Sequence, residues 1–180
     1  IYAPQSLALG IGCERGTQVH EVITLVEKVL ADNSLSSHAI GGIFSIDLKA
    51  DEAALHATAA HFDTRARFFT RDELLEQENR LETPSDVVKA EVGVAGVSEG
   101  AAWAAVGDDG ALIVPKTKSS RATLAIAQGL NHAPEKGHAT EKGRTRGRVS
   151  LIGIGPGTPE WRSPEATKLL SEATDWVGYD

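Results

Sequence analysis

Short apolar runs alternate with segments of helical periodicity along most of this chain, and this alternation constrains the fold more than any other feature. Residues 7–11 form an apolar run that ends at a glycine turn, which is typical of a buried strand. Apolar residues then recur three and four positions apart over residues 19–30, which predicts a helix with Thr17 as its N-cap. A second strand is predicted over residues 40–46.

The alternation continues in the next segment. A helix is expected to begin at Asp51 and Glu52, and a short third strand is expected over residues 67–69. Thr70 and Glu73 match a capping box, in which each side chain accepts a hydrogen bond from the other residue's backbone N–H. This pair predicts another helix start directly after the third strand.

Two further helices and a hairpin complete the pattern. One helix is expected to begin at Ser85 after Pro84, and an alanine-rich helix is expected over residues 98–106. The runs 111–114 and 123–127 predict two strands that pair as a hairpin. We therefore expect an α/β fold, a three-layer α/β/α domain whose largely parallel or mixed sheet carries helices on both faces.

A glycine-rich basic segment divides the chain into two unequal parts. Residues 131–148 hold three glycines and five basic residues against two acidic ones, and they include no large apolar residue. This composition predicts a flexible linker between a domain of residues 1–130 and a piece of residues 149–180. A basic patch for an anionic ligand is the alternative. The second piece reads as a strand-helix-strand stub, with its helix beginning at Ser163, too short to fold alone.

The composition excludes several classes of protein. The net charge of −7 disfavours a nucleic-acid partner, and no apolar run has the length of a membrane span. The single cysteine excludes an internal disulfide and favours the cytoplasm. The absence of methionine, even at position 1, suggests a piece of a longer protein.

The first candidate site is the turn Gly-x-Gly-Cys-x-Arg-Gly-Thr over residues 10–17. A strand enters this turn and a helix leaves it, so free backbone amides at the helix start could bind an anion, with Arg15 adding charge. A tight turn that needs Gly12 and Gly16 is the alternative. Cys13 could be a nucleophile beside Arg15, although a small buried residue is the simpler interpretation.

The second candidate site is the segment 45–52, which leaves the carboxyl end of a predicted strand and runs into a helix. Ligands bind at this edge in open α/β sheets. Lys49 lies between carboxylates and could bind an acid group or act as an acid. Alternatively, Asp51 and Glu52 complement the helix dipole and Lys49 pairs with them.

A third candidate is the segment 93–99, where Ser98 is expected to cap a helix and Glu99 to lie in its first turn. A helix cap is a sufficient explanation for both residues. The histidines on the predicted helices do not combine with a second ligand in a recognised metal pattern, so no metal site is expected.

These segments, taken in order, resemble the CobE/CbiG C-terminal domain family of cobalamin biosynthesis over residues 7–128. The resemblance rests on the turn at residues 10–17, Ser-x-Asp-x-Lys-x-x-Glu at 45–52, Gly-Val-x-x-Val-x-Glu at 93–99, and Lys116. The tail resembles the start of a tetrapyrrole methyltransferase of the precorrin-3B type, on the motif Gly155, Pro156 and Gly157. The resemblance of the tail implies S-adenosylmethionine as the cofactor of a full methyltransferase domain. It implies no cofactor for the present chain.

The resemblance implies a module that binds a corrin precursor and is tethered to a methyltransferase, with other cobalamin-pathway enzymes as possible partners. Alternatively, the chain is the C-terminal half of a cobalt-precorrin-5A lactone hydrolase that releases acetaldehyde and needs a further N-terminal domain. We expect this piece alone to bind rather than to catalyse. The implied catalytic residues are Lys49, Glu52 and Glu99. The implied substrate-binding residues are Gly12, Cys13, Arg15, Gly16, Thr17, Ser45, Asp47 and Lys116. They are expected to form a positive pocket on an acidic body.

Overall fold

The computed structural model describes residues 4–85, 92–129, 137–139, 152–153 and 163–172. The chain divides into two units, Ile1–Arg144 and Thr145–Asp180. The first unit contains the sheet and all the candidate residues of the domain predicted over residues 1–130.

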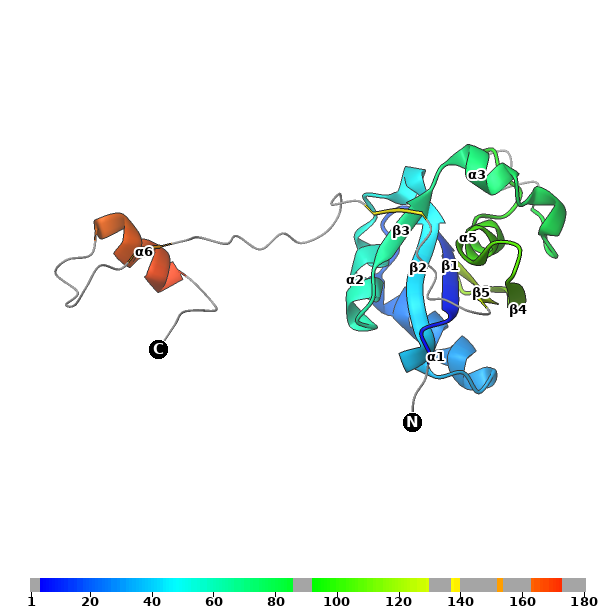
Figure 1. The fold of residues 1–180 in the computed structure, drawn as a ribbon, viewed down its shortest axis with the longest axis horizontal. Helices are drawn as coiled ribbons and strands as arrows, with labels where there is room; N and C mark the ends of the chain where they lie inside the picture. Colours follow the sequence, from blue (N-terminus) through cyan, green and yellow to red (C-terminus); the bar gives the residue numbers. More distant parts are fainter. Residues whose placement is uncertain (1–3, 86–91, 130–136, 140–151, 154–162, 173–180) are drawn as a thin grey trace. The chain divides into compact units, whose positions relative to one another are not determined.

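A mixed sheet forms the centre of the first unit, with its strands in the order β4-β5-β1-β2-β3-β6 (Figure 1). The strands are β1 (Leu7–Cys13), β2 (Ile40–Ile46), β3 (Ala66–Phe69), β4 (Ala111–Lys118), β5 (Ala122–Gln128) and β6 (His138–Ala139). The three strands β1, β2 and β3 are parallel, and β5 runs antiparallel to both β1 and β4. The predicted hairpin is therefore confirmed, with strands that extend further than expected.

Helices cover both faces of this sheet, which confirms the three-layer α/β/α architecture. They are α1 (Val19–Asp32), α2 (Ala53–His61), α3 (Arg71–Leu75) and α5 (Val97–Val106), with short 3₁₀ helices η1 (Ser37–Ala39), η2 (Asp47–Lys49) and η3 (Glu78–Arg80). On one face, Leu9 and Ile11 of β1 pack in a cluster with α1 and α2. Ala8, which points to the other face, packs in a cluster with α5.

Helix α5 lies very close to β1, and Gly10 permits this approach. A Cβ atom at Gly10 would lie 1.9 Å from the carbonyl oxygen of Ser98 and 2.7 Å from the amide nitrogen of Ala102. Both neighbouring atoms belong to the backbone of α5 and cannot rotate away. Only glycine therefore fits at this position of the central strand.

In the first unit, two predicted helix caps are wrong, and one is confirmed. The N-cap of α1 is Gln18, because the Thr17 hydroxyl donates to the carbonyl oxygen of Glu14 at 2.8 Å instead of capping the helix. The N-cap of α5 is Gly96, which places Ser98 inside the helix rather than at its cap. The capping box of Thr70 and Glu73 is present at the start of α3.

Strand β6 lies within the segment expected to be a plain linker. His138 and Ala139 pair with Phe68 and Arg67 of β3, so these two residues extend the sheet. The pairing shows that a stretch without large apolar residues can still join a sheet through its backbone. The helix expected from Ser85 falls on residues 86–91, which lie outside the described residues.

The second unit contains α6 (Pro164–Glu172). The backbone N–H of Ala166 donates to the Ser163 hydroxyl at 3.1 Å, so Ser163 caps a helix whose first residue is proline, as predicted. The strands expected on either side of this helix fall largely outside the described residues, as do Gly155, Pro156 and Gly157. In the part of the chain that the structure describes, no helix has the length and apolarity that a membrane span requires.

Candidate functional site

The candidate site lies where the parallel strands β1 and β2 end at the same edge of the sheet. The loop 13–17 follows β1, and η2 follows β2. This is the edge at which α/β sheets bind ligands. The structure therefore brings together the first two of the three segments that the sequence singled out.

Glu52 occupies the anion site that the loop was expected to offer to a ligand. Its side chain is only 8% exposed, and both carboxylate oxygens lie 3.3 Å from the backbone nitrogen of Gly16, which donates to them. The amide predicted to bind a substrate anion thus binds a carboxylate of the protein itself. This contact joins the start of α2 to the loop that leads into α1.

Arg15 forms a second bridge between the same two segments. Its guanidinium donates to the carboxylate of Asp51 and, at 2.6 Å, to the carbonyl oxygen of Leu48. Glu52 lies 3.9 Å away. The hydrogen bond to Asp51 raises the pKa of Arg15 above its ordinary value. Arg15 is therefore paired with protein carboxylates. These contacts do not form the positive pocket that the sequence led us to expect.

Arg121, in the turn between β4 and β5, holds the other side of the loop. Its Nε lies 2.8 Å from Oε2 of Glu14, and its Nη2 donates to the carbonyl oxygen of Arg15 at 2.9 Å. Glu21 of α1 accepts hydrogen bonds from the Arg121 backbone N–H and from the Ser119 hydroxyl. The sequence analysis missed Arg121 because its partner Glu14 is 107 residues away and no local pattern marks it.

Lys49 is a cation at this edge that forms no ion pair within the described part of the chain. It is half-buried at the end of η2.

The positive charge of Lys49 lowers the pKa of the Cys13 thiol, as does the charge of Arg15. Burial acts more strongly in the opposite direction, and Glu52 adds to it, so that the pKa of Cys13 rises from 9.0 to about 11. Cys13 is therefore a neutral thiol at neutral pH.

This raised pKa predicts slow alkylation of Cys13. At pH 8 we expect the folded protein to react with iodoacetamide about 100-fold more slowly than the protein unfolded in urea, because only the thiolate reacts and its fraction falls about tenfold per unit of pKa. The rate in the folded protein should keep rising up to about pH 11. Equal rates for folded and unfolded protein at pH 8 would contradict this assignment and restore Cys13 as a candidate nucleophile.

Glu99 forms a separate polar cluster on the α5 side of the sheet. It is fully buried and accepts hydrogen bonds from the Thr83 hydroxyl at 2.6 Å, from the backbone of Lys116 at 2.9 Å, and from the backbones of Glu82 and Thr83 at 3.0 Å. Burial tends to raise the pKa of Glu99, but these hydrogen bonds outweigh it and hold the pKa below its ordinary value. Every one of these partners belongs to the protein, so the contacts give Glu99 a structural role. Its catalytic role stays a prediction.

Lys116 belongs to this second cluster as well. Its ammonium group donates to the carbonyl oxygen of Thr83, and burial lowers its pKa. The same side chain that was expected to bind substrate therefore ties β4 to the segment before α5.

Three other predicted residues have clear structural surroundings. A Cβ atom at Gly12 would lie 2.7 Å from the Thr123 hydroxyl, so a larger residue there would require the Thr123 side chain to move. Ser45 is 1% exposed and donates to the carbonyl oxygen of Ile11 at 2.7 Å, which ties β2 to β1. Asp47 is exposed at the start of η2. Their roles in binding substrate stay predictions.

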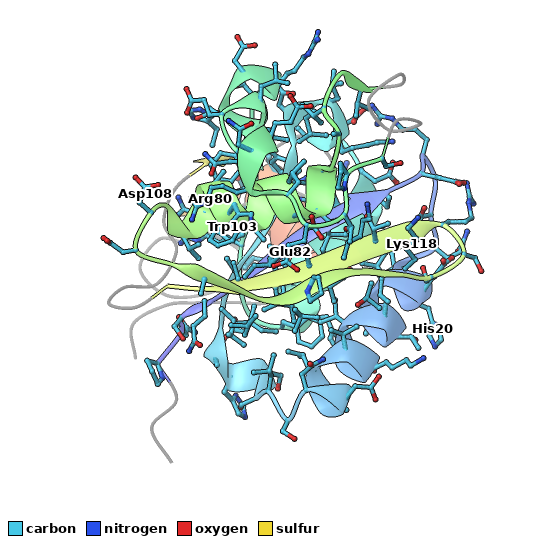
Figure 2. All side chains as sticks on the ribbon, turned by 90° about the vertical axis from the view of Figure 1, so that its right-hand side faces the viewer. His20, Arg80, Glu82, Trp103, Asp108 and Lys118 are labelled. Atoms are coloured by element: carbon cyan, nitrogen blue, oxygen red, sulfur yellow. The ribbon has the colours of Figure 1, made fainter. Side chains whose placement is uncertain are left out.

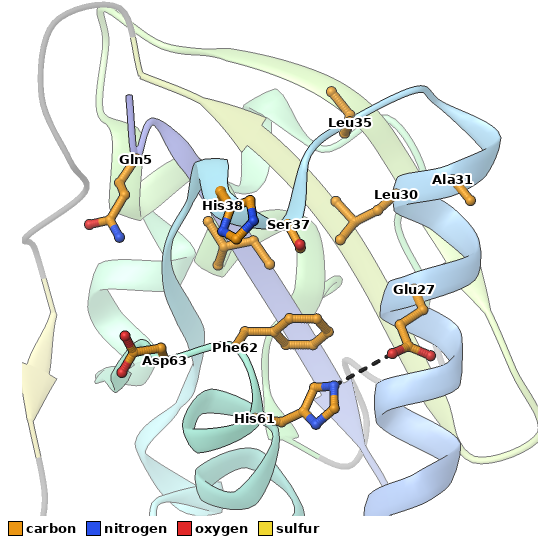
Figure 3. A pocket seen from close by; sticks show the side chains of 11 residues that line it. Gln5, Glu27, Leu30, Ala31, Leu35, Ser37, His38, His61, Phe62 and Asp63 are labelled. Atoms are coloured by element: carbon orange, nitrogen blue, oxygen red, sulfur yellow. Dashed lines mark ion pairs between the residues drawn. The ribbon is translucent and has the colours of Figure 1, made fainter. Parts of the chain in front are cut away.

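Two cavities among the described residues lie away from these clusters. One of about 530 Å³ lies at the opposite edge of the sheet, where His61 of α2 pairs with Glu27 of α1 at 3.5 Å (Figure 3). Another of about 600 Å³ is lined in part by Arg80, whose guanidinium lies 3.7 Å from the centre of the Trp103 ring (Figure 2). Across the described ranges, no group of three or more His, Cys, Asp or Glu side chains could hold a metal ion.

Comparisons with known proteins agree with this fold. A family described as "Cobalamin synthesis G C-terminus" matches residues 7–127. The chain is 42% identical over 125 residues to Protein CobE of Sinorhizobium sp., covering 69% of this chain and 81% of that protein. A crystal structure described as CobE, a protein from the cobalamin biosynthetic pathway, superposes with a TM-score of 0.66 at 32% identity, covering 69% of this chain and 91% of that one.

A larger enzyme shares the same segment. The chain is 35% identical over 127 residues to a cobalt-precorrin-5A hydrolase of Priestia megaterium, covering 71% of this chain and 33% of the hydrolase. The chain thus spans about a third of the length of that enzyme.

Proposed function

Because this chain belongs to the cobalamin synthesis G C-terminus family and therefore to cobalamin biosynthesis, we propose that it binds a corrin precursor through the acidic side chains of the ring. Corrin precursors carry several acetate and propionate groups. The observation that supports this proposal is Lys49, a half-buried lysine at the ligand-binding edge of the sheet that no carboxylate of the described residues neutralises. Lysine binds carboxylates as a compact point charge.

Replacing Lys49 tests the proposal. We expect Lys49→Ala to weaken binding of cobyrinic acid, a corrin with free carboxylates, about tenfold, which corresponds to ~1.4 kcal/mol for one charge-assisted contact. The measurement is an absorbance titration at low salt. Lys28→Ala, which removes an exposed lysine of α1, serves as the control and should leave the affinity unchanged. Equal affinities of the wild-type protein and Lys49→Ala would remove Lys49 from the site.

The similarity to hydrolases supports a second candidate, that this domain contributes half of a site that opens the lactone of cobalt-precorrin-5A. In that case Lys49 would polarise the carbonyl group and Glu52 would activate water, and Glu99 would assist as the family resemblance implies. An assay for acetaldehyde release from a lactone-bearing corrin precursor separates the candidates. Binding without aldehyde supports the binding module, whereas aldehyde release supports the hydrolase.

We also propose that residues 149–180 begin a tetrapyrrole methyltransferase that uses S-adenosylmethionine. The support is the resemblance of Gly155, Pro156, Gly157 and the helix that follows them. A binding module tethered to a methyltransferase would present its corrin to the next enzyme without release. Sequencing the transcript beyond the codon for Asp180 tests this proposal, since a methyltransferase must continue with the segments that complete its cofactor site.

A further inference from the structure

We propose that Asp51 is a competing carboxylate that holds Arg15 until a substrate carboxylate replaces it, and that Asp51 thereby sets the affinity of this edge for acidic ligands. The inference rests on the proposed function, because it concerns the same corrin carboxylates. It adds a residue that determines affinity by opposing binding, where the other candidate residues favour it.

The two carboxylates beside Arg15 differ in how firmly they are held. The Arg15 and Asp51 side chains are 57% and 56% exposed, and an ion pair between side chains this exposed contributes little to stability. Glu52, in contrast, is 8% exposed and accepts a hydrogen bond from the Gly16 backbone. An incoming carboxylate can therefore displace Asp51 at little cost, whereas Glu52 stays in place.

The backbone contact of Arg15 makes this exchange specific. Nη2 of Arg15 donates to the carbonyl oxygen of Leu48 at 2.6 Å, and that contact does not depend on Asp51. This contact anchors the guanidinium when Asp51 leaves, and Nη1, which donates to Asp51, becomes available to the ligand. A guanidinium recognises a carboxylate through its fixed fork of N–H groups, so a ligand carboxylate can take the position of Asp51.

The exchange leaves the number of carboxylates bound to the guanidinium unchanged, because the ligand carboxylate takes the place of Asp51 at Arg15. A monocarboxylate gains little from this exchange, since it only replaces an equivalent partner. A ligand with several carboxylates gains more, because a second one can reach Lys49 at the same edge. The arrangement therefore favours polycarboxylates over simple acids.

The test compares Asp51→Asn with Asp32→Asn, which removes the same charge from an exposed position at the far end of α1. We expect Asp51→Asn to tighten binding of cobyrinic acid about threefold to fivefold at low salt, within the range of an exposed ion pair, and Asp32→Asn to change it by less than twofold. The gain should shrink at high salt, because salt screens exposed charges. Equal or weaker binding by Asp51→Asn would overturn the inference.

A second measurement keeps the inference testable when no corrin binds. Phenylglyoxal modifies free guanidinium groups, and peptide mass mapping reports the rate at Arg15 alone. We expect Asp51→Asn to raise this rate at least threefold and Asp32→Asn to leave it unchanged. A raised rate without corrin binding supports the role of Asp51 and contradicts the proposed function. An unchanged rate in Asp51→Asn contradicts the role of Asp51 and leaves the proposed function standing.

Discussion

Replacement of Glu99 by glutamine is expected to lower the free energy of unfolding by about 3 kcal/mol. Each carboxylate oxygen accepts two hydrogen bonds, Oε1 from the Thr83 hydroxyl and the Lys116 backbone, and Oε2 from the backbones of Glu82 and Thr83. Glutamine puts an NH₂ group in place of one oxygen, so two donors of these part-buried hydrogen bonds lose their acceptor in either orientation. Each unsatisfied donor costs about 1–3 kcal/mol. Urea unfolding at pH 7 measures the loss.

Glu82→Gln is the matched control for this variant, because the Glu82 side chain is exposed and only its backbone bonds to Glu99 (Figure 2). It should change the free energy of unfolding by less than about 0.5 kcal/mol.

The pH dependence of stability gives a further check on the role of Glu99. The lowered pKa of Glu99 means that its contribution is present above its ordinary pKa of 4.5 and is lost as the pH falls through the value in the folded state. The difference between wild type and Glu99→Gln should therefore shrink in acid. If Glu99→Gln and Glu82→Gln were equally stable at pH 7, the hydrogen bonds to the Glu99 carboxylate would not stabilise the fold.

Replacement of Gly10 by alanine is expected to lower the free energy of unfolding by about 3 kcal/mol or to prevent folding. The added methyl group would lie 1.9 Å from the Ser98 carbonyl oxygen, so α5 would have to move away from the central strand. Overpacking a core in this way costs about 1–3 kcal/mol when side chains can adjust, and here the obstacle is backbone. The yield of folded protein and urea unfolding measure the effect.

Gly100→Ala gives this prediction a control on the same helix. A Cβ atom at Gly100 would lie 3.7 Å from its nearest neighbours, on Leu74, which is an ordinary contact distance. Alanine also favours a helix over glycine by about 1 kcal/mol, so Gly100→Ala should stabilise the protein. A Gly10→Ala variant as stable as the wild type would mean that α5 and β1 are not packed as closely as described.

The sequence predicted the elements whose signals are local. The apolar run at residues 7–11, the helical spacing over 19–30 and the capping box of Thr70 and Glu73 all depend on neighbours within a few residues, and each corresponds to an element of the structure. The wrong helix cap at Thr17 has a different origin. The Thr17 hydroxyl bonds within its own turn and lies within 3.4 Å of the Arg121 carbonyl oxygen, so tertiary packing outweighed the local preference.

The candidate site could be located from the sequence, but its contacts could not. The ends of the parallel strands indicated the right edge of the sheet, and Arg15 and Lys49 are both there. The partners of the loop are 36 residues away at Glu52 and 107 residues away at Arg121. The spacing of residues within one element cannot predict contacts between residues so far apart in the sequence. A glycine loop before a helix looks the same in sequence whether its amide faces a ligand or, as here, a carboxylate of the protein.

The central strand β1 has consequences for how the domain is made. It is synthesised first among the strands, yet its neighbour β5 ends at Gln128, near the end of the domain. The loop after β1 likewise depends on Arg121 for its shape. During translation β1 must therefore wait, exposed and incompletely paired, until about 120 further residues have left the ribosome. Pairing over such a separation is slow, so β1 lacks its β5 partner throughout this interval, which is when chaperones would matter most to the yield of folded protein.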